Sequence, residues 1–468
     1  MKAAVHNLGC KTNAYEAEAM EESLKRSGYE IVEFNKETPA DIYVINTCSV
    51  TNIADRKSRQ MLHRAKTMNP NAVVVAVGCF VQANAEEVIE NEPIDICLGT
   101  NNKHMLVECI KRFLDKREPI VEITDISRSA NYESLEETSL PRHTRAYIKI
   151  QDGCDQFCTY CIIPYARGRI RSRTVKDILS EAGRLAGEGI KEIVLTGINM
   201  SSYGADFRRE ALKRALSEGE ETCISEIPDI GDVISALQRV EGIERIRISS
   251  VDPQMITDEF LQKIEGADKL CPHFHLSLQS GCDTVLKRMN RGYTASEYMD
   301  KCKKLREYFD DPSFTTDVIA GFPGETQEEF DSTLNFIKEV NFLDMHIFQF
   351  SPRQGTPAAV MEDQIEPRVK QVRSAVLINA AQEMTERNLE RLIGKKEKVL
   401  VEEKTEISER SFWVGHTTRY VRLCIPYEAG NDDMTDKIVE VEIKGLMEDK
   451  RSLYGRQVYA YSAGQEQV

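Results

Sequence analysis

The first 125 residues alternate between short apolar runs and stretches whose apolar positions recur every three or four residues. The short runs predict strands at Lys2–Leu8, Ile42–Ile45 and Val73–Val77. The periodic stretches predict helices at Glu16–Ser27, Ala54–Met68 and Ala83–Asn91. Strands that alternate with helices are typical of an α/β domain with a parallel sheet, which we place at residues 1–125.

A second α/β region follows a polar linker at 126–144 and occupies residues 145–370. Periodicity alone leaves open a partial barrel, a full eight-stranded barrel and an open sheet. The charged, irregular span Gly204–Pro228 is interpreted as an insertion or a mobile lid. Six strands are predicted here, at Arg145–Gln151, Glu192–Thr196, Arg245–Ser250, His273–Leu278, Ser313–Ile319 and Met345–Phe350.

A long helical pattern at Glu366–Ile393 supplies a connecting helix, assigned to 371–394, and leads into a β-rich end of the chain. About five strands within 395–463 predict a small closed antiparallel β-barrel of a kind that binds oligonucleotides. A dimerisation or packing module is the alternative. The strands with the clearest patterns are Lys396–Glu403, Phe412–His416, Tyr420–Ile425 and Lys437–Ile443.

The composition indicates the class of protein and its cellular location. The 468 residues are 41% hydrophobic and 29% charged, ordinary values for a globular protein of several domains. No apolar run approaches the roughly 18 residues of a membrane span, and the N-terminus lacks the apolar core of an export signal. Thirteen cysteines in such a chain predict a reducing, cytoplasmic location, with thiols kept for metal binding or packing.

The net charge of −15 is spread unevenly, and two segments lack acidic residues altogether. The first runs from Arg56 to Ala85 and carries five basic residues on one predicted helix. The second runs from Gln156 to Lys176. Local basic stripes, rather than total charge, decide whether a surface binds phosphates. An ordinary solvated surface is the alternative, but we expect an RNA-binding stripe at Arg167, Arg169, Arg171 and Arg173.

Three cysteines in eight residues carry the strongest chemical signal. Cys154, Cys158 and Cys161 have the spacing C-x-x-x-C-x-x-C. A four-iron cluster takes four ligands, so three thiolates leave one iron open for a small molecule. A structural zinc site is closed and usually built from two spaced ligand pairs, and no fourth Cys follows until Cys223. An iron–sulfur cluster is therefore favoured over zinc and over free thiols.

Three further cysteines follow the first three predicted strands. Cys10, Cys48 and Cys79 each come at or just after a strand's carboxyl end. Ligands of open parallel sheets gather at that edge, so the three thiols are expected to converge. The alternative is three buried cysteines, which are common in cores.

Taken together, these segments resemble the methylthiotransferases of the radical S-adenosylmethionine (SAM) enzymes. The resemblance covers essentially the whole chain and rests on the motifs around the six cysteines, on His275–Gly281 and on Gly321–Thr326. It implies a central partial (βα)6 barrel and a C-terminal barrel of the TRAM type. It also implies SAM and two 4Fe–4S clusters as cofactors, the second held by Cys10, Cys48 and Cys79 and supplying the sulfur.

The resemblance also implies positions that bind SAM. Tyr160 matches the residue that contacts adenine, and Asp317 to Gly321 resembles the motif behind the adenine, with Asp317 in place of its first glycine. Strand-end turns and core packing are the alternatives for these positions. The full set of expected cofactor-binding residues is Tyr160, Thr196, Gly197, Gln279, Gly321 and Glu325.

Within the family, the sequence around Cys10 looks most like the bacterial branch that modifies threonylcarbamoyladenosine at position 37 of tRNA. The reaction implied is radical abstraction at carbon two of the base and insertion of a methylthio group. The expected partners are the tRNA anticodon stem-loop and a reductant such as flavodoxin or ferredoxin, with the chain acting as a monomer. Branches acting on isopentenyladenosine or a ribosomal-protein aspartate stay open, as does a redox-sensing iron–sulfur regulator that binds RNA.

Overall fold

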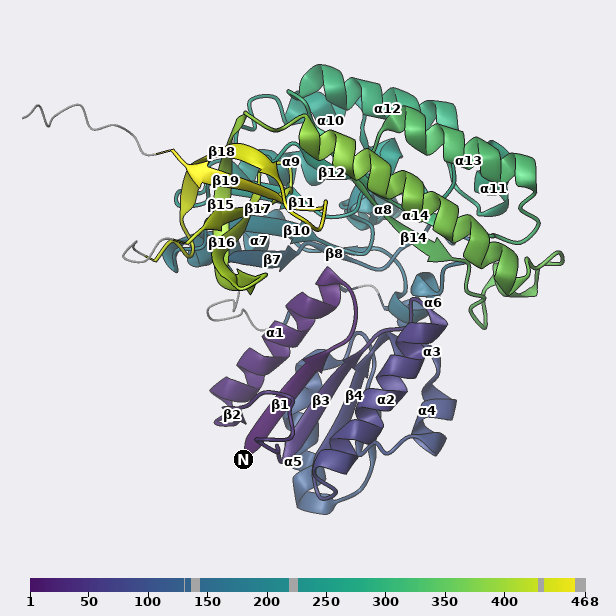
Figure 1. The fold of residues 1–468 in the computed structure, drawn as a ribbon. Coiled ribbons are helices and arrows are strands. Elements are labelled where there is room, and N and C mark those ends of the chain that lie inside the picture. The colour runs from purple at the N-terminus through teal and green to yellow at the C-terminus, as the bar shows by residue number, and fades with distance from the viewer. Residues whose placement is uncertain (130, 136–143, 219–225, 428–432, 459–468) are drawn as a thin grey trace, which may run out of the picture.

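A computed structural model describes residues 1–129, 131–135, 144–218, 226–427 and 433–458. Three units follow one another along the chain, and Figure 1 shows the N-terminal sheet below a larger barrel, with a small yellow barrel at its side. Cys223, much of the predicted linker and residues 219–225 of the predicted insertion lie outside the described residues. No helix among those described is long and apolar enough to cross a bilayer.

The N-terminal unit is a six-stranded sheet with strand order β2-β1-β3-β4-β5-β6, and all of its paired strands are parallel. Alternate residues of the central strands pack into separate cores on the two faces, which explains their unbroken apolar runs. The parallel α/β prediction is confirmed. The strands are β1 (Lys2–Asn7), β2 (Glu30–Ile31), β3 (Ile42–Thr47), β4 (Val73–Gly78), β5 (Ile96–Leu98) and β6 (Ile120–Glu122).

Helices cover both faces of this sheet. The helix predicted at Ala83–Asn91 is two short helices, and one further helix follows β5. The helices are α1 (Lys11–Arg26), α2 (Asn52–Met68), α3 (Cys79–Ala83), α4 (Ala85–Asn91) and α5 (Leu106–Lys116), with a 3-10 turn η1 (Lys103–Met105).

The central unit is the partial barrel. Two three-stranded parallel sheets, β7-β10-β11 and β12-β13-β14, are joined by parallel bridges from Ile246 to Leu270 and from Val251 to Leu276. The six predicted strands are confirmed in order, and no pairing closes β14 onto β7 in the described chain. Their bounds are β7 (Arg145–Lys149), β10 (Glu192–Thr196), β11 (Arg245–Ile248), β12 (His273–His275), β13 (Ser313–Ala320) and β14 (Asp344–Gln349).

Helices pack outside these strands around the largest core of the chain. A two-stranded ribbon, β8 (Gln151–Asp152) and β9 (Arg171–Ser172), flanks the cysteine loop. The helices are α6 (Ile163–Arg167), α7 (Val175–Gly187), α8 (Ala205–Glu218), α9 (Ile230–Leu237), α10 (Asp258–Lys263), α11 (Asp283–Arg288), α12 (Ala295–Tyr308), α13 (Gln327–Val340) and α14 (Pro367–Glu390).

Two segments expected to be irregular are ordered in part. The predicted insertion contains helix α8, whose Asp206 accepts hydrogen bonds from the backbone and side chain of Ser172. In the predicted linker, Tyr132 donates to the backbone of Lys149 and Glu133 is buried. Both segments therefore pack against the barrel, which their polar sequences did not reveal.

The C-terminal unit is a closed five-stranded barrel in the order β15-β16-β17-β19-β18. Its core contains Trp413 and is shared with Leu389 at the end of α14. The prediction of a small closed barrel is confirmed, but β17 and β19 pair in parallel while the other pairs are antiparallel. The strands are β15 (Lys396–Ile407), β16 (Arg410–Thr417), β17 (Arg422–Pro426), β18 (Ile438–Leu446) and β19 (Leu453–Gln457).

The turn between β16 and β17 of the small barrel packs against the end of the central barrel at which its strands begin. Tyr420 lies between β16 and β17, with its ring stacked on His273 at 5.1 Å and on His416 at 4.7 Å. Arg247 and Arg145 lie over the same ring at 4.6 and 5.4 Å. The small barrel is therefore fixed to the central unit through a cation-and-ring stack.

Candidate active site between the two α/β domains

The C-x-x-x-C-x-x-C loop leaves ribbon strand β8 and ends at helix α6, on the face where strands of the barrel end. Gly153 begins the loop with a φ of +73°, and a Cβ there would lie 1.9 Å from the Arg169 carbonyl oxygen. Only glycine fits this approach. The tight start brings Cys154, Cys158 and Cys161 to the mouth of the barrel.

Polar groups from loops of the barrel lie next to these thiols. Arg291 Nη1 lies 3.3 Å from Cys158 Sγ, and Asn199 Nδ2 lies 3.8 Å from Cys154 Sγ. Burial, together with the neighbouring Cys158 and Cys154 thiols, raises the pKa of Cys161 to about 12. Such thiols stay protonated unless a metal centre replaces the proton.

The three strand-end cysteines lie together at the facing edge of the N-terminal sheet. Cys10 precedes α1, Cys48 follows β3 and Cys79 begins α3. A Cβ on Gly9, next to Cys10, would lie 3.2 Å from Cys48 Sγ. Burial raises the pKa of Cys48 to about 11, with Cys79 and then Cys10 acting in the same direction. The structure thus brings together thiols that are up to 69 residues apart in sequence.

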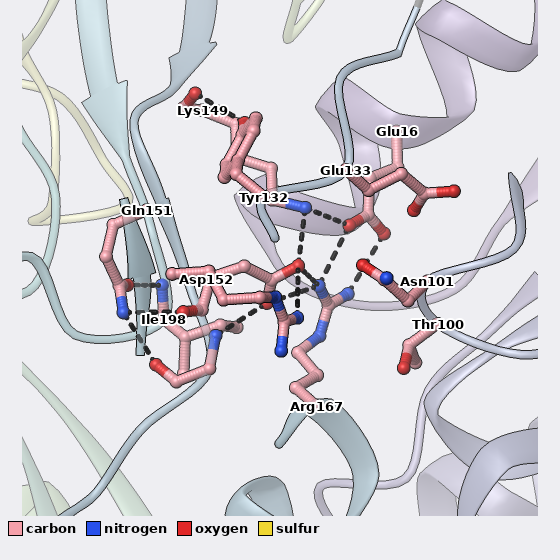
Figure 2. Close-up of polar contacts among 12 residues, drawn as sticks. Glu16, Thr100, Asn101, Tyr132, Glu133, Lys149, Gln151, Asp152, Arg167 and Ile198 are labelled. Atoms are coloured by element: carbon pink, nitrogen blue, oxygen red, sulfur yellow. Dashed lines mark hydrogen bonds and ion pairs between the residues drawn. The ribbon is translucent and has the colours of Figure 1, made fainter. Parts of the chain in front are cut away.

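A buried ionic network lies between the two sets of cysteines, and Figure 2 shows the polar contacts around Arg167, Glu16, Lys149 and Asp152. Arg167 of α6 donates from Nε to Cys79 Sγ at 3.2 Å and from Nη1 to Glu16 of α1 at 2.8 Å. The same Nη1 reaches Asp152 Oδ1 at 3.1 Å, and Lys149 Nζ bridges Glu16 and Asp152 at 2.7 and 2.6 Å. These four charged side chains are at most 2% exposed. The network fixes the N-terminal unit against the barrel.

Further charges extend the network on the N-terminal side. Lys103 lies 3.5 Å from both Glu16 and Glu133, and Glu133 also accepts from His104. The carboxylates reduce the free-energy cost of burying the cations. In turn, the cations hold the pKa of Glu16 and of Asp152 well below the usual range despite burial. No local sequence pattern indicates these pairings, although a lysine at position 149 of a buried strand predicts a buried partner.

The arginines predicted to form an RNA-binding stripe are mostly inside the protein. Arg167 and Arg171 are fully buried and Arg173 is 7% exposed, paired with Glu181. Their charges are already matched by carboxylates, which corrects the prediction for these three residues. Arg169 differs: its side chain is half exposed and lies 4.6 Å over the ring of Phe157.

Two of the expected SAM-binding residues line the mouth of the barrel next to the cysteine loop. Thr196 ends β10, and a Cβ on Gly197 would lie 3.1 Å from Gln151 Oε1. The same Oε1 accepts hydrogen bonds from the backbone nitrogens of Ile198 and Asn199. Gln151 therefore fixes the turn that carries Asn199 to Cys154.

Tyr160 and Gln279 also lie at this end of the barrel. The Tyr160 ring contacts Phe322 edge-on at 6.5 Å, and its pKa is raised well above the usual range by burial and by Cys158. Gln279 has a φ of +68°, and its backbone nitrogen donates to the Asp317 carbonyl, so it sits on a sharp turn after β12.

Gly321 and Glu325 form a closed polar contact. Gly321 has a φ of +73°, and its backbone nitrogen donates to Glu325 Oε1 at 3.1 Å. Arg373 of α14 donates to the same carboxylate oxygen at 2.7 Å. With Glu325 only 4% exposed, its carboxylate holds α14 against the barrel rather than facing the cysteine loop.

Comparisons with known proteins agree with this arrangement. The family model described as Radical SAM superfamily matches residues 148–337, and the one described as Uncharacterized protein family UPF0004 matches residues 2–99. The threonylcarbamoyladenosine tRNA methylthiotransferase MtaB of Bacillus subtilis is 41% identical over 94% of this chain and 93% of its own. The tRNA-2-methylthio-N(6)-dimethylallyladenosine synthase of Pelotomaculum thermopropionicum is 34% identical over 94% of each chain.

Solved structures support the fold. The radical S-adenosylmethionine methyltransferase TsrM of Kitasatospora setae, solved with a SAM analogue, has a TM-score of 0.53 at 14% identity, covering 77% of this chain and 75% of its own. The chain belongs to the radical SAM methylthiotransferase family. Enzymes of this family use SAM and two 4Fe–4S clusters.

Proposed function

We propose that this enzyme adds a methylthio group to carbon two of N6-threonylcarbamoyladenosine at position 37 of tRNA. Three relatives named as threonylcarbamoyladenosine tRNA methylthiotransferases support the proposal, at 36 to 41% identity over at least 85% of this chain. The observation that carries it is the meeting of two cysteine triads across one domain boundary, joined by Arg167. Such a pair suits a reaction that needs a radical and a sulfur donor at one place.

Cys154, Cys158 and Cys161 would hold one 4Fe–4S cluster, and Cys10, Cys48 and Cys79 would hold the other. No three His, Cys, Asp or Glu side chains in the described chain are grouped to hold a single metal ion. A four-iron cluster needs its thiols further apart than a single metal ion does, because each thiolate binds a different iron atom. When bound, the clusters and SAM supply radical generation, sulfur and the methyl group.

The protein's own residues position these groups. Gly153 and the Gln151 amide set the loop that carries the first triad. Arg291 and Asn199 present N–H groups to two of its sulfurs, where such donors stabilise anionic thiolates. Arg167 does the same for Cys79, and its burial keeps water from that side of the site. Thr196, Gly197, Tyr160 and Gln279 line the same mouth and are proposed to contact SAM.

The proposed RNA contacts lie near this mouth. Arg169 is exposed beside the cysteine loop, and Arg56 and Lys57 are exposed in the first turns of α2. Neither Arg56 nor Lys57 has an ion pair among the described residues. Phosphate contacts of this kind position an RNA, while contacts to the base specify it. The five-stranded barrel would act as a TRAM-type module beside them.

The remaining partners follow from the reaction. Reduction of a cluster needs an external electron donor, for which flavodoxin or ferredoxin is proposed. A tRNA substrate places the enzyme in the cytoplasm, and both triads lie on one chain, so a monomer suffices.

The function is tested by mass analysis of tRNA nucleosides from cells that lack this protein. Loss of 2-methylthio-N6-threonylcarbamoyladenosine, with the unthiolated nucleoside accumulating, is the expected result. If that nucleoside persists and the dimethylallyl counterpart disappears instead, the chain acts like its 34% identical relatives of that name.

A further inference from the structure

A cavity of about 370 Å³ lies below the mouth, between strands β12 to β14, helix α14 and the C-terminal barrel. Its lining comes from all three units of the chain. Most of its lining residues carry charged or hydrogen-bonding side chains, among them Lys11, His275, Thr315, His346, Arg422 and Arg451. A space reached from every domain is a natural place for part of a substrate.

Lys11 is the residue that connects this cavity to the sulfur-supplying triad. It directly follows Cys10 and is the first residue of α1. Its ammonium makes no hydrogen bond or ion pair within the described residues, although most of it is shielded from solvent. The charged groups around it are Arg247 and Arg145 on the barrel floor and Asp317 on β13. Asp317 is itself 3.4 Å from His275.

The lining as a whole has an excess of positive charge. Arg422 and Arg451 form no ion pair in the part of the chain described, and Asp344 is the only acidic residue in the lining. One Asp344 oxygen already accepts from the Met345 backbone nitrogen. A nearby carboxylate, Asp449, faces Arg422 from the small barrel. Neither Asp344 nor Asp449 forms an ion pair with Lys11 or Arg451 in the described chain.

A second observation points to a missing ligand. His273 is 4% exposed and lines the cavity, yet its Nδ1 has no hydrogen-bond partner in the described chain. Its Nε2 and His275 Nδ1 share the Thr315 hydroxyl at 3.1 and 3.0 Å. A buried polar atom without a partner costs about 1–3 kcal/mol, and a ligand in the cavity that it lines would remove this cost.

We infer that this cavity receives the N6-threonylcarbamoyl group of the substrate base, with Lys11 Nζ binding its carboxylate. The inference rests on the proposed function, and it names the group of the substrate base that the site would recognise. C2 and N6 flank N1 on one edge of adenine, so a group beside Lys11 lies near the carbon to be modified next to Cys10. The hydroxyl and carbamoyl of the same substituent match the His273 and Thr315 positions.

The same geometry explains a choice between substrates. A dimethylallyl group carries no charge and would leave the Lys11 ammonium desolvated without a partner. Sites built around a polar contact reject analogues that lack it far more strongly than apolar pockets reject a missing methylene. Lys11 is therefore a specificity-determining residue.

The test is equilibrium binding of anticodon stem-loops to the anaerobically reconstituted holoenzyme without reductant. The stem-loops carry threonylcarbamoyladenosine, its neutral methyl ester, or unmodified adenosine at position 37. Loss of one hydrogen-bonded charge pair corresponds to about a 10- to 100-fold weaker affinity. Lys11→Met should bind the stem-loop with threonylcarbamoyladenosine more weakly by this factor and bind the unmodified stem-loop with unchanged affinity. Lys11→Arg should recover part of the lost affinity.

Controls separate charge recognition from general RNA binding and from folding. Lys57→Gln on exposed α2 should weaken all stem-loops alike. The neutral ester should bind wild-type enzyme as weakly as Lys11→Met binds the acid, a comparison that needs no variant to fold. Equal affinity of wild-type enzyme for acid and ester overturns the inference. Absence of any methylthiolation of threonylcarbamoyladenosine by wild-type enzyme overturns the proposed function instead.

Discussion

Arg167 of helix α6 donates a hydrogen bond from Nε to Cys79 Sγ at 3.2 Å, while its other nitrogens hold Glu16 and Asp152. One side chain from the barrel thus touches a thiol, a helix of the N-terminal sheet and the start of the other cysteine loop. The two proposed cluster sites share a rigid partner.

Replacing Arg167 with Met should destabilise the domain boundary strongly. It would leave two buried carboxylates with reduced compensation, at a cost of about 3–5 kcal/mol. Thermal unfolding of the anaerobic protein measures this. A donor removed from a ligand sulfur should also lower the reduction potential of the second cluster, which redox titration reports. Arg167→Lys keeps the charge but not the forked geometry and should recover stability only in part.

Arg169→Gln is the matched control because Arg169 lies two residues further on and is half exposed. Its effect on stability should stay within about 0.5 kcal/mol. If the two variants unfold alike, the buried network does not hold the domains together.

Each cysteine triad should account for one cluster. Cys48→Ala and Cys158→Ala should each reduce iron content by half after anaerobic reconstitution, since removing one of three ligands empties a site. Only Cys158→Ala should also abolish formation of 5′-deoxyadenosine in the presence of dithionite. Cys282→Ser, outside both triads, should keep full iron content. Full iron in Cys48→Ala would refute the second cluster site.

Stability near neutral pH should depend on His104. The hydrogen bond to Glu133 raises the pKa of His104 above its ordinary value of 6.5. A raised pKa means that this contact stabilises the fold below about pH 6.5 and that the gain is lost as pH rises through the folded-state pKa. The imidazole is more than half exposed, so the gain is at most about 1 kcal/mol.

His104→Gln measures this contribution. The variant should melt below the wild type at about pH 6, and the gap should close by about pH 8.5. A gap that stays constant over this interval would exclude titration of His104 as the cause.

Tyr420 should anchor the small barrel. Truncation to Ala removes two ring stacks and two cation–π contacts, together worth roughly 2–4 kcal/mol. Tyr420→Phe keeps the ring and should cost little. The rate of limited proteolysis after α14 measures release of the barrel. Cleavage should be faster in Tyr420→Ala and unchanged in Tyr420→Phe. Equal cleavage of both variants would show that the stack does not fix the barrel.

The sequence predicted much of the fold because buried parallel strands form long apolar runs. Strands β3, β4 and β10 are of this kind, whereas β7, β11 and β12 mix apolar residues with charged residues or histidine. Strand β5 (Ile96–Leu98) was missed because three residues show no period. The same limit applies to β6.

The charged interior could not be predicted in the same way. Alternating arginines after the cysteine loop have the pattern of a solvated or RNA-binding stripe. Glu16, the partner of Arg167, lies 151 residues earlier, and no local pattern links the two. The Lys11 cavity was missed for a related reason, because its lining is assembled from three domains.

The most direct test of the account uses purified enzyme, SAM, reductant and a stem-loop carrying threonylcarbamoyladenosine at position 37. Mass analysis of the product nucleoside should show a methylthio group replacing hydrogen at carbon two, with wild-type enzyme and not with Cys10→Ala or Cys161→Ala. Product formed by Cys10→Ala, or none formed by fully loaded wild-type enzyme, would contradict it.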